Sequence, residues 1–413
     1  MSTLSNIKLK INIEAFDCYL YSGHLFIFLK DGSISCLNLN KIYHSLYNDN
    51  PDYVNFFRLI FQRNDYYRNN QGEIIFGISE LNKEFKKLWE KISKKIEFQY
   101  DVEDLDILGK IPENELPILD VKIYGMKIFI ATLKGVYSLQ LQSNGREFSK
   151  DCKLKKYFDA KSIHLNAKCG SLAISTNSDG LFFGAIDNNN EVLKVNEKEV
   201  ASKSLRTSWV NYDLINYESN NSFDFLENRV ISQKNNYDYS FSDEKFEKNK
   251  ITAFGINKIS DKELTANLHF DDDKIKYAFN SSSSAFLITD NGKFYNSNII
   301  VEKSADSYLN EFLGENIKKK EENELEVRFS RRFFELPTLK NQKSFRPISS
   351  HIIDKGCVLE FIDKVVIFKD NEANIIEKDD VINLRTYQNS IRYKKVITIV
   401  KSNYITIHSL YPF

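Results

Sequence analysis

Short runs of alternating apolar and polar residues, broken by turn-forming residues, recur along most of this chain. The clearest example is residues 119–141, LDVKIYGMKIFIATLKGVYSLQL, where Gly125 and Gly135 separate three apolar runs. Alternation with a period of two is typical of β-strands, and glycine between such runs indicates a tight turn. The segment therefore predicts three consecutive strands joined by two turns.

Six further segments have the same layout. In the first of them, turns are predicted at Ser22-Gly23 and at Asp31-Gly32, because Asp-Gly between apolar runs favours a type I′ hairpin turn. The complete set of predicted three-stranded units is 16–39, 119–141, 162–186, 205–230, 274–300, 350–368 and 382–410.

Each unit has too few strands to bury both faces of its own sheet, so the units must pack on one another. Radial packing closes such an array into a β-propeller. By this layout the chain resembles the β-propeller superfamily, although no Trp-Asp dipeptide ends a repeat as in tryptophan-aspartate propellers. The resemblance implies a rigid disc whose faces and loops bind other molecules, and it implies no reaction. We expect a mainly β protein, with residues 1–413 forming a single β-propeller of about seven blades.

Closure of the ring can be predicted from the two ends of the chain. Residues 6–13 alternate as a strand does, and they precede the first unit. The last unit ends near residue 410 with little chain left for an outer strand. Because an open ring would expose strand edges, we expect residues 6–13 to complete the last blade antiparallel to residues 404–410.

Two segments interrupt the strand pattern. Residues 41–100 change to a helical period: Asn50-Pro51 is typical of a helix start, and an apolar stripe runs from Leu81 to Ile96. Residues 303–345 are highly charged, and their first half has a helical pattern. We predict a helical insertion between the first two blades and a second, partly helical charged insertion.

The helical insertion supplies the candidate residues for binding a protein partner. Its first helix is apolar nearly all round, which is more than one packing surface requires. This helix either packs on the apolar stripe of the second helix or leaves aromatic surface exposed for a partner. The candidate interface residues are Tyr53, Phe56, Phe57, Ile60, Phe61 and Trp89.

A segment that combines basic and aromatic residues is the candidate for nucleic-acid contact, since such side chains bind phosphates and stack on bases. Acidic residues are interleaved with it, and a mixed-charge segment is more typical of a solvated face. The candidate basic residues are Lys318, Lys319, Lys320, Arg328, Arg331 and Arg332.

Composition and missing motifs argue against several classes of function. Lys+Arg and Asp+Glu are both 57, so the whole chain gives no reason to expect nonspecific attraction to nucleic acid or acidic lipid. No signal-peptide core or membrane-spanning run is present, which predicts a soluble, cytoplasmic protein without membrane contact. Phosphate-binding, zinc-protease and esterase motifs are missing, as is any pair of histidines at ligand spacing, so we predict no catalytic residue, metal or cofactor.

The favoured hypothesis is a noncatalytic scaffold that binds proteins, as a subunit of a larger assembly. A nucleic-acid-associated module using residues 318–334 is the second hypothesis. The third is a propeller enzyme or small-ligand binder with its site at the central channel, where several blades can contribute residues that a sequence does not bring together.

Overall fold

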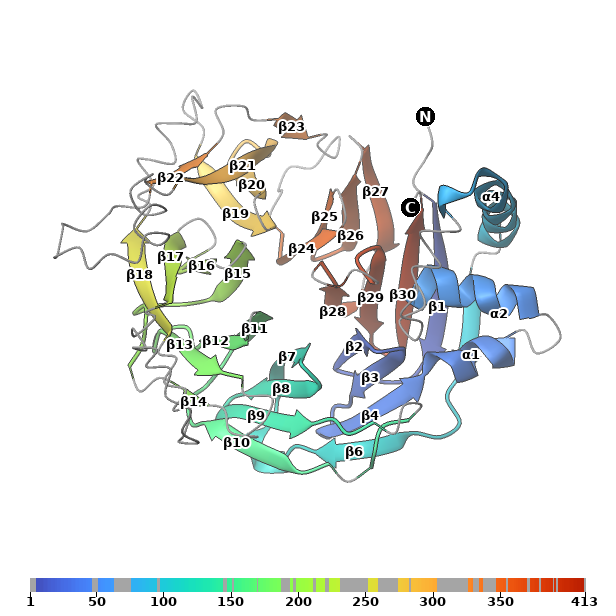
Figure 1. Cartoon of the computed structure of the whole chain (residues 1–413), viewed down its shortest axis with the longest axis horizontal. Helices are drawn as coiled ribbons and strands as arrows, with labels where there is room; N and C mark the ends of the chain where they lie inside the picture. The colour runs from blue at the N-terminus through green and yellow to red at the C-terminus, as the bar shows by residue number, and fades with distance from the viewer. Residues whose placement is uncertain are drawn as a thin grey trace, which may run out of the picture.

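The computed structural model is a ring of seven β-sheets arranged around a common axis (Figure 1). Each sheet is one blade, and the seven predicted three-stranded units form the three inner strands of the seven blades. The prediction of a mainly β, seven-bladed propeller is therefore confirmed. The structure describes residues 5–411 except 47–50, 63–75, 95–96, 144–146, 151, 169, 187–193, 196–197, 211–212, 220–222, 231–251, 259–273, 282–283, 303–325, 330–333, 337–346, 354–355, 370–371, 379, 389 and 391–392.

We number the blades in chain order and give their strands from the channel outward. Blade 1 contains β2 (Asp17–Tyr21), β3 (His24–Phe28), β4 (Ser33–Asn38) and β6 (Asp106–Lys110). Blade 2 contains β7 (Ile118–Tyr124), β8 (Lys127–Thr132), β9 (Gly135–Gln140) and β10 (Leu154–Phe158). Blade 3 contains β11 (His164–Lys168), β12 (Ser171–Ser175), β13 (Leu181–Ala185) and β14 (Lys194–Val195). Blade 4 contains β15 (Arg206–Val210), β16 (Asp213–Tyr217), β17 (Phe223–Val230) and β18 (Thr252–Lys258).

The remaining blades follow the same order. Blade 5 contains β19 (Ile275–Ser281), β20 (Ser284–Thr289), β21 (Phe294–Glu302) and β22 (Glu326–Phe329), with β23 (Phe334–Leu336) also paired to β21. Blade 6 contains β24 (Ser349–Ile353), β25 (Gly356–Phe361), β26 (Lys364–Lys369) and β27 (Glu372–Lys378). Blade 7 contains β28 (Val381–Thr386), β29 (Val396–Lys401), β30 (Tyr404–Tyr411), β1 (Ser5–Asn12) and β5 (Phe98–Asp101).

Two turns of blade 1 can be compared with the turns predicted from the sequence. At the β2–β3 turn, Ser22 and Gly23 both have positive φ (47° and 75°), as a two-residue type I′ hairpin turn requires. At Asp31-Gly32 the type I′ prediction is wrong, because only Gly32 has positive φ (85°) there. The Asp31 carboxylate instead accepts hydrogen bonds from the backbone N–H and the hydroxyl of Ser33, both at 2.9 Å, and so stabilises the turn from its side.

The chain termini close the ring as the sequence predicts. Strand β1 pairs antiparallel with β30 over eight residues, from Ser5 opposite Tyr411 to Asn12 opposite Tyr404. Ile7, Leu9 and Ile11 are buried on one face of β1, in a core that also contains the helical segment. Closure therefore combines a complete hydrogen-bonded ladder with an apolar face.

A buried ionic cluster joins the closing blade to blade 6. Glu377 of β27 lies 2.6 Å from the Lys8 Nζ atom and 3.0 Å from the Lys401 Nζ atom. Its carboxylate also lies 3.3 Å from the Nε2 atom of His408, which is fully buried. Burial opposes ionisation, but hydrogen bonds from His408, Lys8 and Lys401 hold the pKa of Glu377 well below its usual range. One carboxylate thus ties together β27, β1, β29 and β30.

The helical segment lies outside the closing blade (Figure 1). It contains α1 (Leu39–Leu46), α2 (Pro51–Phe57), a π-helical turn η1 (Arg58–Gln62) and α4 (Ser79–Ser93), and a short 3-10 turn η2 (Glu113–Glu115) follows β6. The Ser409 hydroxyl of β30 donates a hydrogen bond to the Ile60 carbonyl at 2.8 Å. The first half of the predicted charged insertion, residues 303–325, lies outside the described residues, whereas β22 and β23 in its second half belong to blade 5.

Candidate functional site

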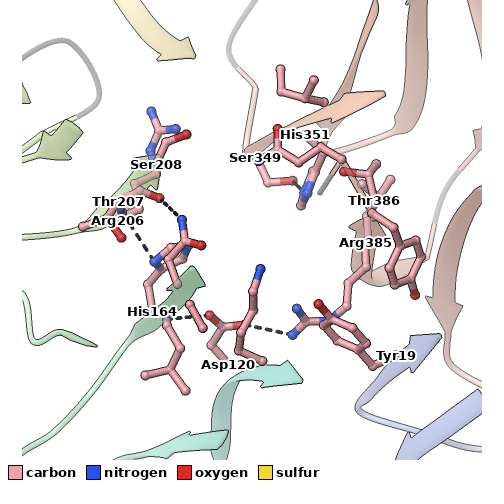
Figure 2. A pocket seen from close by; sticks show the side chains of 18 of the residues that line it. Tyr19, Asp120, His164, Arg206, Thr207, Ser208, Ser349, His351, Arg385 and Thr386 are labelled. Carbon is pink, nitrogen blue, oxygen red and sulfur yellow. Dashed lines mark hydrogen bonds and ion pairs between the residues drawn. The ribbon is translucent and has the colours of Figure 1, made fainter. Parts of the chain in front are cut away.

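The inner strands of all seven blades surround a central cavity of about 990 Å³. Figure 2 shows side chains from separate blades pointing toward this common space. They reach it because alternate residues of an inner strand face the axis of the ring. Six of them carry most of the chemistry described below: Tyr19, Asp120, His164, Arg206, His351 and Arg385.

Arg385 holds three blades together through two carboxylates. Its Nε atom donates to Asp17 Oδ1 at 2.7 Å, and its Nη2 atom donates to the other oxygen of Asp17 and, at 2.8 Å, to Asp120 Oδ1. The second oxygen of Asp120 accepts a hydrogen bond from the Leu165 N–H at 2.8 Å, which adds blade 3 to the network. The Arg385 guanidinium also stacks over the ring of Tyr19, 5.4 Å from its centre.

Burial and charge act in opposite directions on these groups. Burial raises the pKa of Asp17, and the charge of Arg385 opposes that rise. Burial also disfavours ionised Asp120, but Arg385, His164 and the Leu165 N–H together hold its pKa below the usual value. The two carboxylates outweigh burial at Arg385 and raise its pKa well above its usual range. Arg385 is therefore a permanent cation that is already neutralised by the protein.

The two channel histidines are uncharged at neutral pH. Both imidazoles are half-buried on the channel wall, and burial lowers the pKa of His164 to about 4 and that of His351 to about 3. His164 Nδ1 accepts a hydrogen bond from the Thr207 N–H at 3.4 Å, so its proton is on Nε2. A neutral imidazole in this tautomer can donate one hydrogen bond into the channel.

Ser349 and His351 do not have the arrangement of an activated nucleophile. The Ser349 hydroxyl donates to Glu360 Oε2 at 2.5 Å and lies 2.9 Å from His351 Nε2. A hydroxyl has one proton, so Ser349 can only accept from His351 while it donates to Glu360. In a serine nucleophile the direction is the reverse, because the histidine accepts the serine proton.

Arg206 differs from Arg385 because it has no carboxylate partner among the described residues. Two of its nitrogens donate to the Ser350 hydroxyl at 3.3 Å and to the Ala278 carbonyl at 2.6 Å. Its guanidinium carbon lies 4.1 Å from the ring centre of Tyr217 and 4.9 Å from that of Tyr277. Neutral oxygens and aromatic faces therefore fix the position of this cation and leave its charge uncompensated.

The aromatic residues predicted as a partner interface lie mainly inside the protein. Among the six candidates, Tyr53 is half-buried and the other five are buried. The Phe56 ring centre lies 5.2 Å from that of Phe85 in α4, and the Phe57 ring centre lies 5.0 Å from that of Phe98 in β5.

This packing explains why the first helix is apolar on nearly every side. The helix is held between α4 on one side and α1 with the closing blade on the other, so it needs apolar residues on both faces. The buried side chains Phe56, Phe57, Ile60, Phe61 and Trp89 do not form an exposed patch on this chain, so of the two alternatives the structure shows the first helix packed on α4. A role of this segment in partner binding stays a prediction.

The candidate nucleic-acid residues lie mostly outside the described part of the chain. Lys318, Lys319, Lys320, Arg331 and Arg332 fall in this category. Arg328 lies in β22, where its backbone is opposite Ile300 of β21. The nucleic-acid hypothesis therefore stays a prediction.

The channel residues were not predicted from the sequence. Arg385 is 368 positions from Asp17 and 265 positions from Asp120. No motif spacing can show a contact over such separations. The available signal was the period of two in the inner strands, as in Asp120, Lys122 and Tyr124, which all line the channel.

Comparisons with known proteins do not assign the chain to a family. No protein-family model and no curated protein matches the chain. Solved structures that align with it include the N-terminal domain of Nup159, with 10% identity, 100% and 97% of the two chains covered and a TM-score of 0.45. The Pan2 WD40 domain of Neurospora crassa aligns with 6% identity, 100% and 98% coverage and a TM-score of 0.43. The computationally designed Ika8 protein aligns with 7% identity, 97% and 98% coverage and a TM-score of 0.45. At these values the similarities carry no argument about function.

The described residues contain neither a membrane-spanning helix nor a metal-binding cluster. None of their helices is long and apolar enough to cross a membrane. They also contain no group of three or more His, Cys, Asp or Glu side chains that could hold a metal ion.

Proposed function

We propose that this protein is a noncatalytic scaffold that binds a protein partner on one face of its ring. The observation that carries the proposal is the distribution of exposed large apolar side chains. The described residues contain eight of them, and four lie at turns or strand starts on the same face of the disc. The four are Leu133, Ile348, Ile362 and Ile382, with exposed fractions of 40%, 60%, 89% and 38%.

The strand order places these four residues on one face. Neighbouring strands of a blade are antiparallel, so the turn between its second and third strands and the connection entering its first strand lie at the same end. Leu133 is in the β8–β9 turn, and Ile362 is in the β25–β26 turn. Ile348 directly precedes β24, and Ile382 is the second residue of β28, at a register shift that makes it project from the ladder.

The other four exposed side chains lie elsewhere. Ile107 and Ile375 are on the outer strands of blades 1 and 6, and Ile78 and Leu81 are at the start of α4. Ile107 is the second residue of β6, which begins at the opposite face, where the β2–β3 and β7–β8 turns lie; four exposed side chains therefore lie at one face and Ile107 lies near the other. Single exposed apolar residues are normal, whereas their concentration on one face is typical of an interface. The closed ring holds these turns in fixed positions, so a partner would bind a preformed surface.

We include membership of a larger, cytoplasmic assembly in this proposal. A rigid disc with exposed apolar side chains on one face is suited to holding a partner in place. Ser349 has no relay for nucleophilic catalysis, which agrees with a noncatalytic role. We call the face that carries Leu133, Ile348, Ile362 and Ile382 the isoleucine face. The proposed partner presents apolar side chains to it.

The test compares this face with the rim of the disc. The variant Ile348→Asp/Ile362→Asp changes two exposed residues of blade 6 on the isoleucine face, and the control Ile107→Asp/Ile375→Asp changes two exposed residues on outer strands. A protein recovered with the native chain is purified, and its affinity for each variant is measured directly. We expect at least a 10-fold loss of affinity for the first variant, because interface apolar anchors commonly contribute that much, and little change for the control. Equal affinities for two folded variants would refute the proposed face.

A further inference from the structure

The wall of the central channel carries an excess of positive side chains. Lys122, Lys168, Arg206 and Arg385 line it, whereas Asp120 is the single carboxylate among the described residues of the lining. Asp120 contacts Arg385, which is also bonded to the buried Asp17. The negative charge of the wall is therefore paired with Arg385, whereas Lys122 and Arg206 have no carboxylate partner among the described residues.

Arg206 has unused donors in a fixed position. An arginine carries five N–H groups, and only two acceptors, the Ser350 hydroxyl and the Ala278 carbonyl, are within hydrogen-bond distance in the described part of the chain. The rings of Tyr217 and Tyr277 restrict its movement. A planar guanidinium with free N–H groups and no carboxylate partner is suited to binding an oxyanion through two parallel hydrogen bonds.

Lys122 and His164 complete a set of donors around the same space. Lys122 lies two residues after Asp120 on β7, so its side chain leaves the strand on the channel side, and it forms no ion pair with any described residue. The three groups come from the inner strands of three neighbouring blades that are hydrogen-bonded beside them. Asp120, on the same strand as Lys122, accepts from the Leu165 N–H next to His164, and the Thr207 N–H next to Arg206 donates to His164. His164 carries its proton on Nε2, since Nδ1 accepts from Thr207.

We propose that the central channel binds a small organic phosphate whose phosphoryl oxygens contact Arg206, Lys122 and the Nε2–H of His164. A phosphomonoester carries nearly two negative charges at neutral pH and has three terminal acceptor oxygens, which match two cations and one neutral donor. A cavity of about 990 Å³ has the size of a small-molecule site. Tyr19 and Tyr124 also line it, and their half-buried rings offer contact surface for the organic part. This binding function is distinct from partner binding at the isoleucine face, although Ile348 belongs both to that face and to the lining of the cavity.

Calorimetric titration of the full chain tests the proposal. The probes are phenyl phosphate, inorganic phosphate, and benzoate as a monocarboxylate with the same ring, with sodium chloride matching the ionic strength. We expect saturable binding of phenyl phosphate, with benzoate binding at least 10-fold more weakly. Arg206→Gln and Lys122→Gln should each weaken binding by about 10-fold to 100-fold, because each removes a charge-assisted hydrogen bond. Lys134→Gln, at the exposed β8–β9 turn, should not change it.

Three results would overturn the proposal. The first is that neither phosphate probe binds beyond the effect of sodium chloride. The second is that benzoate binds as tightly as phenyl phosphate. The third is that Lys122→Gln, with circular dichroism showing a native fold, retains the affinity of the natural chain. Since Lys122 makes no ion pair with any described residue, this variant keeps the test valid if Arg206→Gln fails to fold.

Discussion

The closing strand β1 should be required for stability, and its contribution can be worked out from three side chains. Ile7, Leu9 and Ile11 have exposed fractions of 1%, 0% and 0%. Burying one such side chain contributes roughly 1.5–3 kcal/mol, so the three together contribute about 5–9 kcal/mol. A protein is typically stable by about 5–15 kcal/mol. Deletion of residues 1–12 should therefore remove most of the free energy of unfolding.

A single substitution gives the quantitative form of this prediction. Leu9→Ala should lower the free energy of unfolding by about 2–5 kcal/mol, as expected for a fully buried leucine. The matched control is Lys10→Gln on the same strand. Lys10 is paired with Glu97 at 3.7 Å, and both side chains are partly exposed, so the control should cost at most about 1 kcal/mol.

Urea unfolding followed by circular dichroism measures both variants and the deletion. A synthetic peptide of residues 1–14, added to the deleted chain, should restore the urea midpoint, because it can pair with the free edge of β30. A peptide with lysine at positions 7, 9 and 11 should not. If the deleted chain unfolds at the midpoint of the full chain, or if Leu9→Ala costs no more than Lys10→Gln, the account of ring closure is refuted.

Three further predictions concern buried contacts. Glu377→Gln should cost about 3 kcal/mol at pH 7, because it leaves buried cations unpaired. The folded pKa of Glu377 is depressed, so its stabilisation is complete above the unfolded pKa of about 4.3 and declines as pH falls from there toward the folded pKa. The difference in urea midpoint between the two proteins should therefore be smaller at pH 3 than at pH 7, and a constant difference would contradict this. Arg385→Met should cost about 3–5 kcal/mol by leaving Asp17 buried without its partner, and adding Asp17→Asn should recover part of the loss in a double-mutant cycle; additive losses would argue against the ion pair. Phe57→Ala should cost about 3–5 kcal/mol, and a loss below 1 kcal/mol in urea unfolding would show that the helical segment is not part of the propeller core.

The sequence predicted the local elements well because local elements depend on local signals. The seven units and the closing strand were recognisable from a period of two and from turn residues such as Ser22-Gly23. The outer strands of the other six blades were not predicted, since they are short or more exposed; β10, for example, has no buried residue. Apolarity on every side of the first helix correctly indicated two packing surfaces, but it could not show that both were supplied by the same chain.

By itself, then, the order of residues determined the strands, their turns and the need to close a ring, because each rests on alternation or on backbone conformation over a few positions. Only the tertiary structure decided which side chains share a space. Asp17, Asp120, His164, Arg206 and Arg385 come from five different blades and meet because the innermost strand of each blade presents alternate residues to one axis. The uncompensated charge of Arg206 is also a property of the assembled channel. The carboxylates of Asp17 and Asp120, which lie far from Arg385 in sequence, contact Arg385 and not Arg206.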